Sequence, residues 1–276
     1  MVEGTLFDNY VVVVDPRSLE VGGSWQGTPR EGVPITWDAE TIEFFYERTL
    51  EFEQPMILDV GASTGGFCLL SKINQDIRGI AFEPLPQVYE ILVRNLVLNR
   101  LQDKMKALPI ALSDYTGTAV LKYPRSGRES HLACIGNPLR FDEWFEIEVP
   151  VTTLDKVLSE EGIRNIDLIK IDTEGCELFI LKGAENLIKN YYPDLLVECY
   201  SPNTRQFGYE PLETVKLLKS WGYDFITVSS HDRYFFKRQK LKKKLALLQR
   251  LSVVRLVRWA RFAEHRLRAR LTSREL

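Results

Sequence analysis

The chain has 276 residues, 45% of them hydrophobic, which is enough for one substantial α/β core with an appendage. No basic region precedes the first apolar run, and no apolar stretch reaches the roughly 18 residues of a membrane span, so we expect neither a signal peptide nor a transmembrane helix. The four cysteines form no C-x-x-C pair, which favours free thiols. These features together predict a reduced, cytoplasmic protein.

The net charge of −2 hides a basic tail at residues 237–276. This segment carries 14 Lys and Arg against two Glu, or +12, while the rest of the chain carries −14. Apolar positions at helical spacing, with Trp259 and Phe262 near the boundary, predict a basic amphipathic helix. Such a helix fits an anionic membrane surface, which would make the protein peripheral to a membrane. Docking on the acidic core or on a partner's helix is the alternative, and nucleic acid is disfavoured because no reader motif is present.

A glycine-rich turn follows the apolar stretch Met56–Val60, which is typical of a buried parallel strand. After the turn, the apolar run Phe67–Leu70 is expected to begin a helix. Gly61 and Gly65 have no Cβ, so the backbone there can turn sharply and approach a ligand closely. The glycine spacing fits neither the dinucleotide fingerprint nor the phosphate loop, and no Lys follows. The stretch therefore favours a nucleoside ligand without a polyphosphate.

Two further predicted strands end in polar residues. The strand Ile77–Phe82 is followed by Glu83, whose carboxylate is placed to accept hydrogen bonds from both hydroxyls of a ribose. The strand Lys106–Leu112 is followed by Ser113 and Asp114. Because ligands of such sheets sit outside the carboxyl ends of the strands, these two residues are placed to meet an adenine ring. For Asp114 the alternative is a turn residue that stabilises the glycine three positions later.

Strands and helices alternate along most of the chain, which predicts an α/β fold with a mainly parallel sheet and right-handed crossovers. Helices are predicted at 39–52, 86–99, 156–161, 176–187 with a break at Gly183, and 211–221; strands at 10–14, 118–123, 146–151, 166–172, 194–199, 223–228 and 233–236. Asn95 and Asn99 are neighbours on the second helix, and we expect them to be solvated or to cap its end unless they serve the site.

Several motifs occur in the order that is typical of one enzyme family. They are Asp59-Val60-Gly61-Ala62 with Gly65, Phe82-Glu83-Pro84, Asn95 with Asn99, Ala111-Leu112-Ser113-Asp114, Thr152-Thr153-Leu154-Asp155, and Ile169-Lys170-Ile171-Asp172-Thr173-Glu174-Gly175-Cys176-Glu177. On these residues the chain resembles the FkbM-type S-adenosylmethionine-dependent methyltransferases over roughly residues 55 to 236. Ser63 stands where that family more often has Asn, which is also a short polar residue.

The resemblance implies a Rossmann-like methyltransferase fold with an antiparallel C-terminal hairpin, to which the basic C-terminal helix is added. It divides the chain into an N-terminal extension and helix at 1–54, a methyltransferase domain at 55–236 and the tail at 237–276. The implied cofactor is S-adenosylmethionine. The residues expected to bind it are Asp59, Gly61, Ala62, Ser63, Gly65, Glu83, Ser113 and Asp114.

Methyl transfer to a hydroxyl needs alignment of the reacting atoms and a base. Asp172, at the tip of a predicted buried strand, is the first candidate; it could also hold the methionyl amine, ligate a metal or be a structural turn residue. His131 is the second candidate, in the polar loop 124–138 that is expected to lie on the substrate side, although a loop histidine is commonly a surface residue. Glu174 and Glu198 could join Asp172 around Mg²⁺ or Ca²⁺, but strand-end carboxylates also cap helices and pair with cations, so we predict no metal.

The predicted function is O-methylation of a hydroxyl on a sugar or glycan. A hydroxyl of a polyketide-type secondary metabolite is the alternative acceptor. A hypothesis of another class is a non-catalytic scaffold that binds S-adenosylmethionine and recruits a partner or a membrane through its basic tail.

Overall fold

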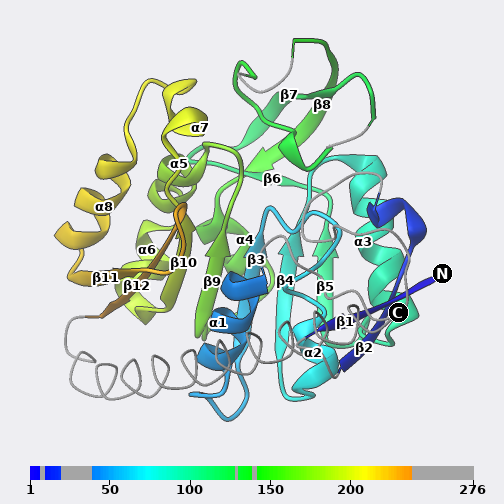
Figure 1. The fold of residues 1–276 in the computed structure, drawn as a ribbon. Coiled ribbons are helices and arrows are strands. Elements are labelled where there is room, and N and C mark those ends of the chain that lie inside the picture. The colour runs from blue at the N-terminus through cyan, green and yellow to red at the C-terminus, as the bar shows by residue number, and fades with distance from the viewer. Residues whose placement is uncertain (7–9, 20–38, 128–129, 139–141, 238–276) are drawn as a thin grey trace, which may run out of the picture. The chain divides into compact units, whose positions relative to one another are not determined.

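The computed structural model describes residues 1–6, 10–19, 39–127, 130–138 and 142–237, and residues 1–236 form one compact unit (Figure 1). A seven-stranded sheet of order β11-β12-β10-β9-β3-β4-β5 forms its centre. Its strands are β3 (Met56–Val60), β4 (Arg78–Phe82), β5 (Met105–Leu108), β9 (Leu168–Ile171), β10 (Asp194–Glu198), β11 (Tyr223–Thr227) and β12 (Asp232–Lys237). The five strands from β10 to β5 are parallel, and β12 pairs antiparallel with β10. The mainly parallel sheet and the antiparallel hairpin at its edge are both confirmed.

Helices cover both faces of this sheet. One face carries α1 (Ala39–Thr49), α2 (Leu70–Ile73) and α3 (Pro86–Leu98); the other carries α4 (Leu154–Glu160), α5 (Glu177–Lys182), α6 (Glu185–Tyr191) and α8 (Pro211–Ser220). Because successive side chains of a strand point to opposite faces, Ile57 packs in the first layer and Leu58 in the second. Strands that are buried on both faces explain the continuous apolar runs of the sequence.

Two predicted helices differ in detail from the structure. The apolar run after the glycine-rich turn forms hydrogen-bonded turns that bury Phe67 and Cys68, and α2 begins only at Leu70. The predicted break at Gly183 is confirmed, since it separates α5 from α6. A Cβ at Gly183 would lie 2.0 Å from the carbonyl oxygen of Ser113, so the close approach of these two segments requires glycine.

A second, three-stranded sheet of order β6-β8-β7 lies beyond the carboxyl ends of β3 and β4 (Figure 1). Its strands are β6 (Ala111–Leu112), β7 (Gly117–Pro124) and β8 (Trp144–Thr152). The predicted strand 106–112 is therefore wrong as one element, because it contributes β5 to the main sheet and β6 to the small sheet. Pro109 lies between the two strands, where its missing N–H cannot continue a ladder.

The N-terminal residues pack on α3. The strands β1 (Val2–Leu6) and β2 (Tyr10–Val14) pair antiparallel, and the short helix η1 (Pro16–Leu19) follows. The expectation that Asn95 and Asn99 are solvated is wrong, because both are buried against this segment. Asn99 does cap the end of α3, where its amide donates to the carbonyl of Asn95 at 2.8 Å.

All four cysteines are free and buried. No helix within the described ranges is long and apolar enough to cross a membrane. The predicted helix in the basic tail lies outside the described residues.

Candidate active site

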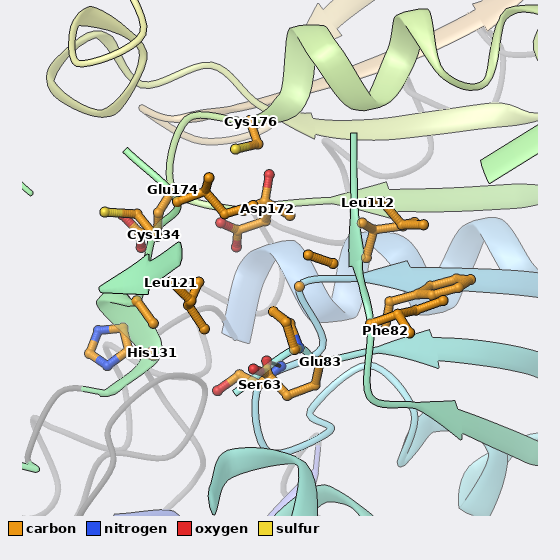
Figure 2. A pocket seen from close by; sticks show the side chains of 18 of the residues that line it. Ser63, Phe82, Glu83, Leu112, Leu121, His131, Cys134, Asp172, Glu174 and Cys176 are labelled. Atoms are coloured by element: carbon orange, nitrogen blue, oxygen red, sulfur yellow. Dashed lines mark hydrogen bonds between the residues drawn. The ribbon is translucent and has the colours of Figure 1, made fainter. Parts of the chain in front are cut away.

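A cavity lies at the carboxyl ends of β3, β4 and β9, between the main sheet and the small one (Figure 2). The space within it, open mouth included, is about 600 Å³. The main sheet and its loops contribute Val60, Gly61, Ser63, Phe82, Glu83, Pro84, Asp172, Thr173, Glu174 and Cys176. The small sheet and its loops contribute Ile110, Ala111, Leu112, Leu121, Ser130, His131, Ala133, Cys134 and Ile135.

The glycine-rich turn presents backbone and hydroxyl groups to this cavity. Gly61 has a φ of +74°, and a Cβ there would lie 1.8 Å from the carbonyl oxygen of Asp172. Ser63 also adopts a left-handed conformation, with a φ of +49°, which costs a serine more than an asparagine. The hydroxyl oxygen of Ser63 is buried and has no hydrogen-bond partner among the described residues. A ligand in the cavity would satisfy this orphaned hydroxyl.

Glu83 links the glycine-rich turn to the end of β4. Its Oε2 accepts from the N–H of Ser63 at 2.9 Å, and its Oε1 accepts from the N–H of Leu85 at 2.9 Å. Burial raises the pKa of Glu83 to about 7, against the opposing effect of these two hydrogen bonds. A buried carboxylate held in this way and facing the cavity suits a pair of ribose hydroxyls.

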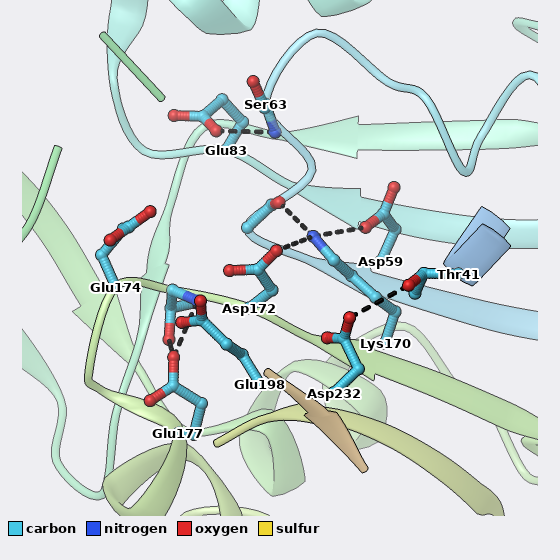
Figure 3. Close-up of polar contacts among 12 residues, drawn as sticks. Thr41, Asp59, Ser63, Glu83, Lys170, Asp172, Glu174, Glu177, Glu198 and Asp232 are labelled. Atoms are coloured by element: carbon cyan, nitrogen blue, oxygen red, sulfur yellow. Dashed lines mark hydrogen bonds and ion pairs between the residues drawn. The ribbon is translucent and has the colours of Figure 1, made fainter. Parts of the chain in front are cut away.

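Lys170 is the residue of this site whose role the sequence analysis missed. The side chain is 7% exposed, and Nζ donates to the carbonyl of Gly61 at 2.7 Å (Figure 3). The same Nζ lies 3.6 Å from Oδ1 of Asp59 and 3.5 Å from Oδ2 of Asp172. A lysine inside an apolar strand was the available signal, because a buried cation needs partners.

Asp59 lies beneath the glycine-rich turn and does not line the cavity. Its Oδ2 accepts from the thiol of Cys68 at 3.3 Å, and Lys170 faces its other oxygen. Burial raises the pKa of Asp59, while Lys170 opposes that shift. Asp59, which was expected to contact the cofactor, thus supports the glycine-rich turn through Lys170.

The turn after β9 is organised around the buried carboxylate of Glu177. Its Oε1 accepts from the N–H and the hydroxyl of Thr173, at 2.9 and 3.0 Å, and from the N–H of Gly175 at 3.1 Å. The phenol of Tyr209 lies 3.2 Å from Oε2. These contacts hold Glu174 at a φ of +57°, with its side chain at the cavity (Figure 2).

The carboxylates considered as metal ligands have other partners. The amide of Asn203 donates to Glu174 at 2.7 Å and to Glu198 at 3.2 Å, while Asp172 faces Lys170. Burial and the neighbouring carboxylates raise the pKa of Glu198 well above its usual range. Across the ranges that the structure describes, no group of three or more His, Cys, Asp or Glu is arranged to hold a metal ion.

The predicted substrate-side loop forms one wall of the cavity. It contains the short helix η2 (Ser130–Leu132), and His131 lines the cavity from this helix. Cys134 pairs with Lys122 of β7 through two backbone hydrogen bonds, at 2.8 and 2.9 Å. Burial raises the pKa of the Cys134 thiol to about 11, so it is protonated at neutral pH.

Besides Asp59, four of the predicted cofactor residues do not line the cavity. They are Ala62, Gly65, Ser113 and Asp114. Ala62 and Gly65 shape the glycine-rich turn, where the N–H of Gly65 donates to the carbonyl of Ala62 at 2.9 Å. The hydroxyl of Ser113 donates to the exposed Asp114 at 3.3 Å, outside the cavity. Residues 110–112, which come just before Ser113 and Asp114, line the cavity instead of them.

Comparison with known proteins agrees with this geometry. Residues 59–225 match the model of the methyltransferase FkbM domain. The chain belongs to the FkbM methyltransferase family. It is an S-adenosylmethionine-dependent methyltransferase with a Rossmann-like fold, as the motifs implied.

Three relatives of this FkbM-type methyltransferase illustrate the family. Methyltransferase sdnD of Sordaria araneosa is 32% identical over 196 residues, which cover 62% of this chain and 74% of the relative. The 31-O-demethyl-FK506 methyltransferase FkbM of Streptomyces tacrolimicus is 30% identical over 206 residues, covering 65% and 76%. The 2-O-methyltransferase NoeI of Sinorhizobium fredii is 27% identical over 180 residues, covering 60% and 71%.

Proposed function

We propose that this methyltransferase methylates a hydroxyl oxygen and that Asp172 is the general base. The observation that carries the proposal is the position of Asp172, at the tip of β9 on the cavity wall, beside the glycine-rich turn. Its side chain is 33% exposed, whereas that of Asp59 is 1% exposed, so Asp172 is the member of this pair that an acceptor can reach.

The residues on the cavity wall fit the cofactor. Glu83 would hold the ribose, while the hydroxyl of Ser63 and the backbone of Gly61 would approach the rest of the nucleoside. When bound, the cofactor supplies an electrophilic methyl group on a positively charged sulfur. Asp172 would take the proton of the acceptor hydroxyl, and Lys170 would hold the Asp172 carboxylate in place.

The first acceptor that we propose is a sugar or glycan. Leu121 lines the cavity, and Tyr123 follows it on the same face of β7. Phe145 lies opposite Tyr123 on β8, with the ring centroids 5.6 Å apart, and it is 45% exposed. The exposed ring of Phe145 and the half-buried ring of Tyr123 can stack on the apolar C–H face of a sugar ring, while Asp172 and Glu174 can accept hydrogen bonds from its hydroxyls.

A polyketide-type secondary metabolite is the second candidate acceptor. The relative that is named as a 31-O-demethyl-FK506 methyltransferase supports it. The apolar side chains of Leu112, Leu121 and Ile135 on the cavity wall would suit such a molecule as well.

Transfer of a labelled methyl group to panels of the two acceptor classes tests the proposal. Asp172→Asn should lower the rate by a factor of about 10² to 10⁴ while the variant still binds the cofactor. Full activity of Asp172→Asn would exclude Asp172 as the base, and a loss confined to His131→Ala would assign that role to His131. Cofactor binding without transfer to any acceptor in either panel would support the scaffold hypothesis instead.

A further inference from the structure

Asn95 lies in the last turn of α3, and none of its surface is exposed. Its side-chain amide contacts two segments that are far apart in the sequence. Oδ1 accepts from the N–H of Asp15 at 2.7 Å, and Nδ2 donates to the hydroxyl of Ser18 at 3.0 Å. The same Nδ2 donates to the carbonyl of Thr64 at 2.8 Å. Asn95 thus connects the N-terminal segment to the glycine-rich turn.

The contact with Thr64 leads directly to the cofactor-binding residues. Thr64 is fully buried and follows Ser63, whose N–H donates to Glu83 and whose hydroxyl lines the cavity. Because Ser63 adopts a left-handed conformation, neighbouring contacts must hold it there. The carbonyl of Thr64, which accepts from Asn95, supplies such a contact.

The N-terminal segment, residues 10–19, is itself anchored along α3. Asn99 exchanges two hydrogen bonds with Val13, at 3.0 and 2.6 Å. Asp15 forms ion pairs with Arg94 and Arg17, both at 2.9 Å. Val12 and Val14 are buried in the same apolar layer as Phe67, which follows the glycine-rich turn. The side chain of Asn95 forms hydrogen bonds with both the N-terminal segment and the glycine-rich turn.

We propose that Asn95 is a positioning residue that couples the docked N-terminal segment to the glycine-rich turn and thereby sets the affinity for S-adenosylmethionine. The segment contributes no residue to the cavity, so its effect on the cofactor passes through Asn95 and Thr64 to Ser63 and Glu83. The inference rests on the placement of the cofactor at Glu83 and is independent of the acceptor and of the base.

The test compares Asn95→Asp with Asn99→Asp by titrating each purified full-length variant with S-adenosylmethionine. Both substitutions are nearly isosteric, and both remove one buried Nδ2 donor. Only Asn95→Asp loses the contact with Thr64, since Asn99 donates to Val13 and to Asn95. We expect at least a tenfold increase in Kd for Asn95→Asp and less than a threefold increase for Asn99→Asp, at temperatures where circular dichroism shows both folded.

A purely structural role would lower the melting temperature of both variants and leave both Kd values alike, and that result would overturn the proposal. Ser18→Ala provides a milder test in case Asn95→Asp does not fold. It removes the acceptor on the N-terminal segment without altering α3 or the turn. We expect a two- to fivefold increase in Kd for Ser18→Ala, and an unchanged Kd in this folded variant would equally contradict coupling between segment and turn.

Discussion

Lys170 joins parts of the site that come from two separate stretches of the chain, residues 59–61 and 170–172. Its ammonium contacts the carbonyl of Gly61 and faces the carboxylates of Asp59 and Asp172. A cation in this position offsets the cost of burying Asp59 and fixes the orientation of Asp172. The lysine therefore connects the stability of the sheet to the geometry of the reaction.

Replacing Lys170 by Met should lower the free energy of unfolding by about 3–5 kcal/mol, because Asp59 keeps a buried carboxylate that has lost its cation. Adding Asp59→Asn should recover part of this loss, since the second substitution removes the unpaired charge. Urea denaturation of the two single variants and the double variant measures the coupling. Strictly additive losses would show that the two side chains do not stabilise each other.

Glu83 should make cofactor binding depend on pH. Its pKa of about 7 in the folded protein lies above the ordinary 4.5, so its contribution to stability is fully present below about pH 4.5 and is lost as the pH rises through 7. Cofactor binding should change in the opposite direction, because the ionised carboxylate accepts both ribose hydroxyls. We expect the affinity to rise about tenfold between pH 6 and pH 8.

Isothermal titration across this pH range, beside Glu83→Gln, checks the prediction. The glutamine variant should bind the cofactor more weakly. Both oxygens of Glu83 accept hydrogen bonds from backbone N–H groups, and in the variant the side-chain NH₂ would face one of these donors. Its affinity should also be nearly independent of pH. The same pH dependence in both proteins would assign the titration to another group.

At the scale of elements, the turn between β9 and α5 depends on a residue from outside both. The phenol of Tyr209 lies 2.9 Å from the carbonyl of Gly175 and 3.2 Å from Glu177. Burial and the nearby Glu177 raise the pKa of this phenol, so it stays protonated and can donate. The segment between α7 (Ser201–Arg205) and α8 thereby fixes the turn that carries Asp172 and Glu174.

Tyr209→Phe should destabilise the protein by about 1–3 kcal/mol and lower the rate of methyl transfer, because it leaves buried groups of the turn unpaired. Tyr223→Phe is the matched control. Its hydroxyl donates to the carbonyl of Pro193 at 2.8 Å, before β10 and at the opposite end of the sheet from the cavity. Equal losses of activity in the two variants would show that the effect is one of global stability alone.

The main elements were predictable because their local pattern agrees with their final environment. Uninterrupted apolar runs become strands that are buried on both faces, and the carboxylates of Glu83 and Asp172 follow from their places at strand tips. The environment of Lys170 was not predictable in the same way, because its partners come from another strand and from a loop.

The burial of the two asparagines also depends on tertiary packing. Local preference places Asn at exposed helix positions or caps, whereas tertiary packing buries Asn95 and Asn99 beneath the N-terminal segment. The division of residues 106–112 between two sheets also depends on tertiary contacts, namely the pairing of β6 with β8. Contacts between distant segments therefore account for these differences.

At the scale of the whole molecule, the basic tail remains a prediction from sequence. Its charge of +12 should bring the protein to anionic vesicles, each cation near the surface contributing about 1 kcal/mol. We expect the full chain to float with vesicles that contain anionic lipid and a variant lacking residues 237–276 to remain behind. Neutral vesicles should retain neither protein. Unchanged flotation of the truncated variant would show that the basic tail is not what binds the membrane.

The central claim is that Glu83 and the glycine-rich turn bind S-adenosylmethionine at the carboxyl ends of β3 and β4. The most direct test is isothermal titration of the full-length protein with S-adenosylmethionine, beside Glu83→Ala in a form that circular dichroism shows to be folded. We expect saturable binding to one site in the wild-type protein and a loss of at least tenfold in affinity in the variant. Absence of binding to the folded wild-type protein, or equal affinity in the variant, would contradict it.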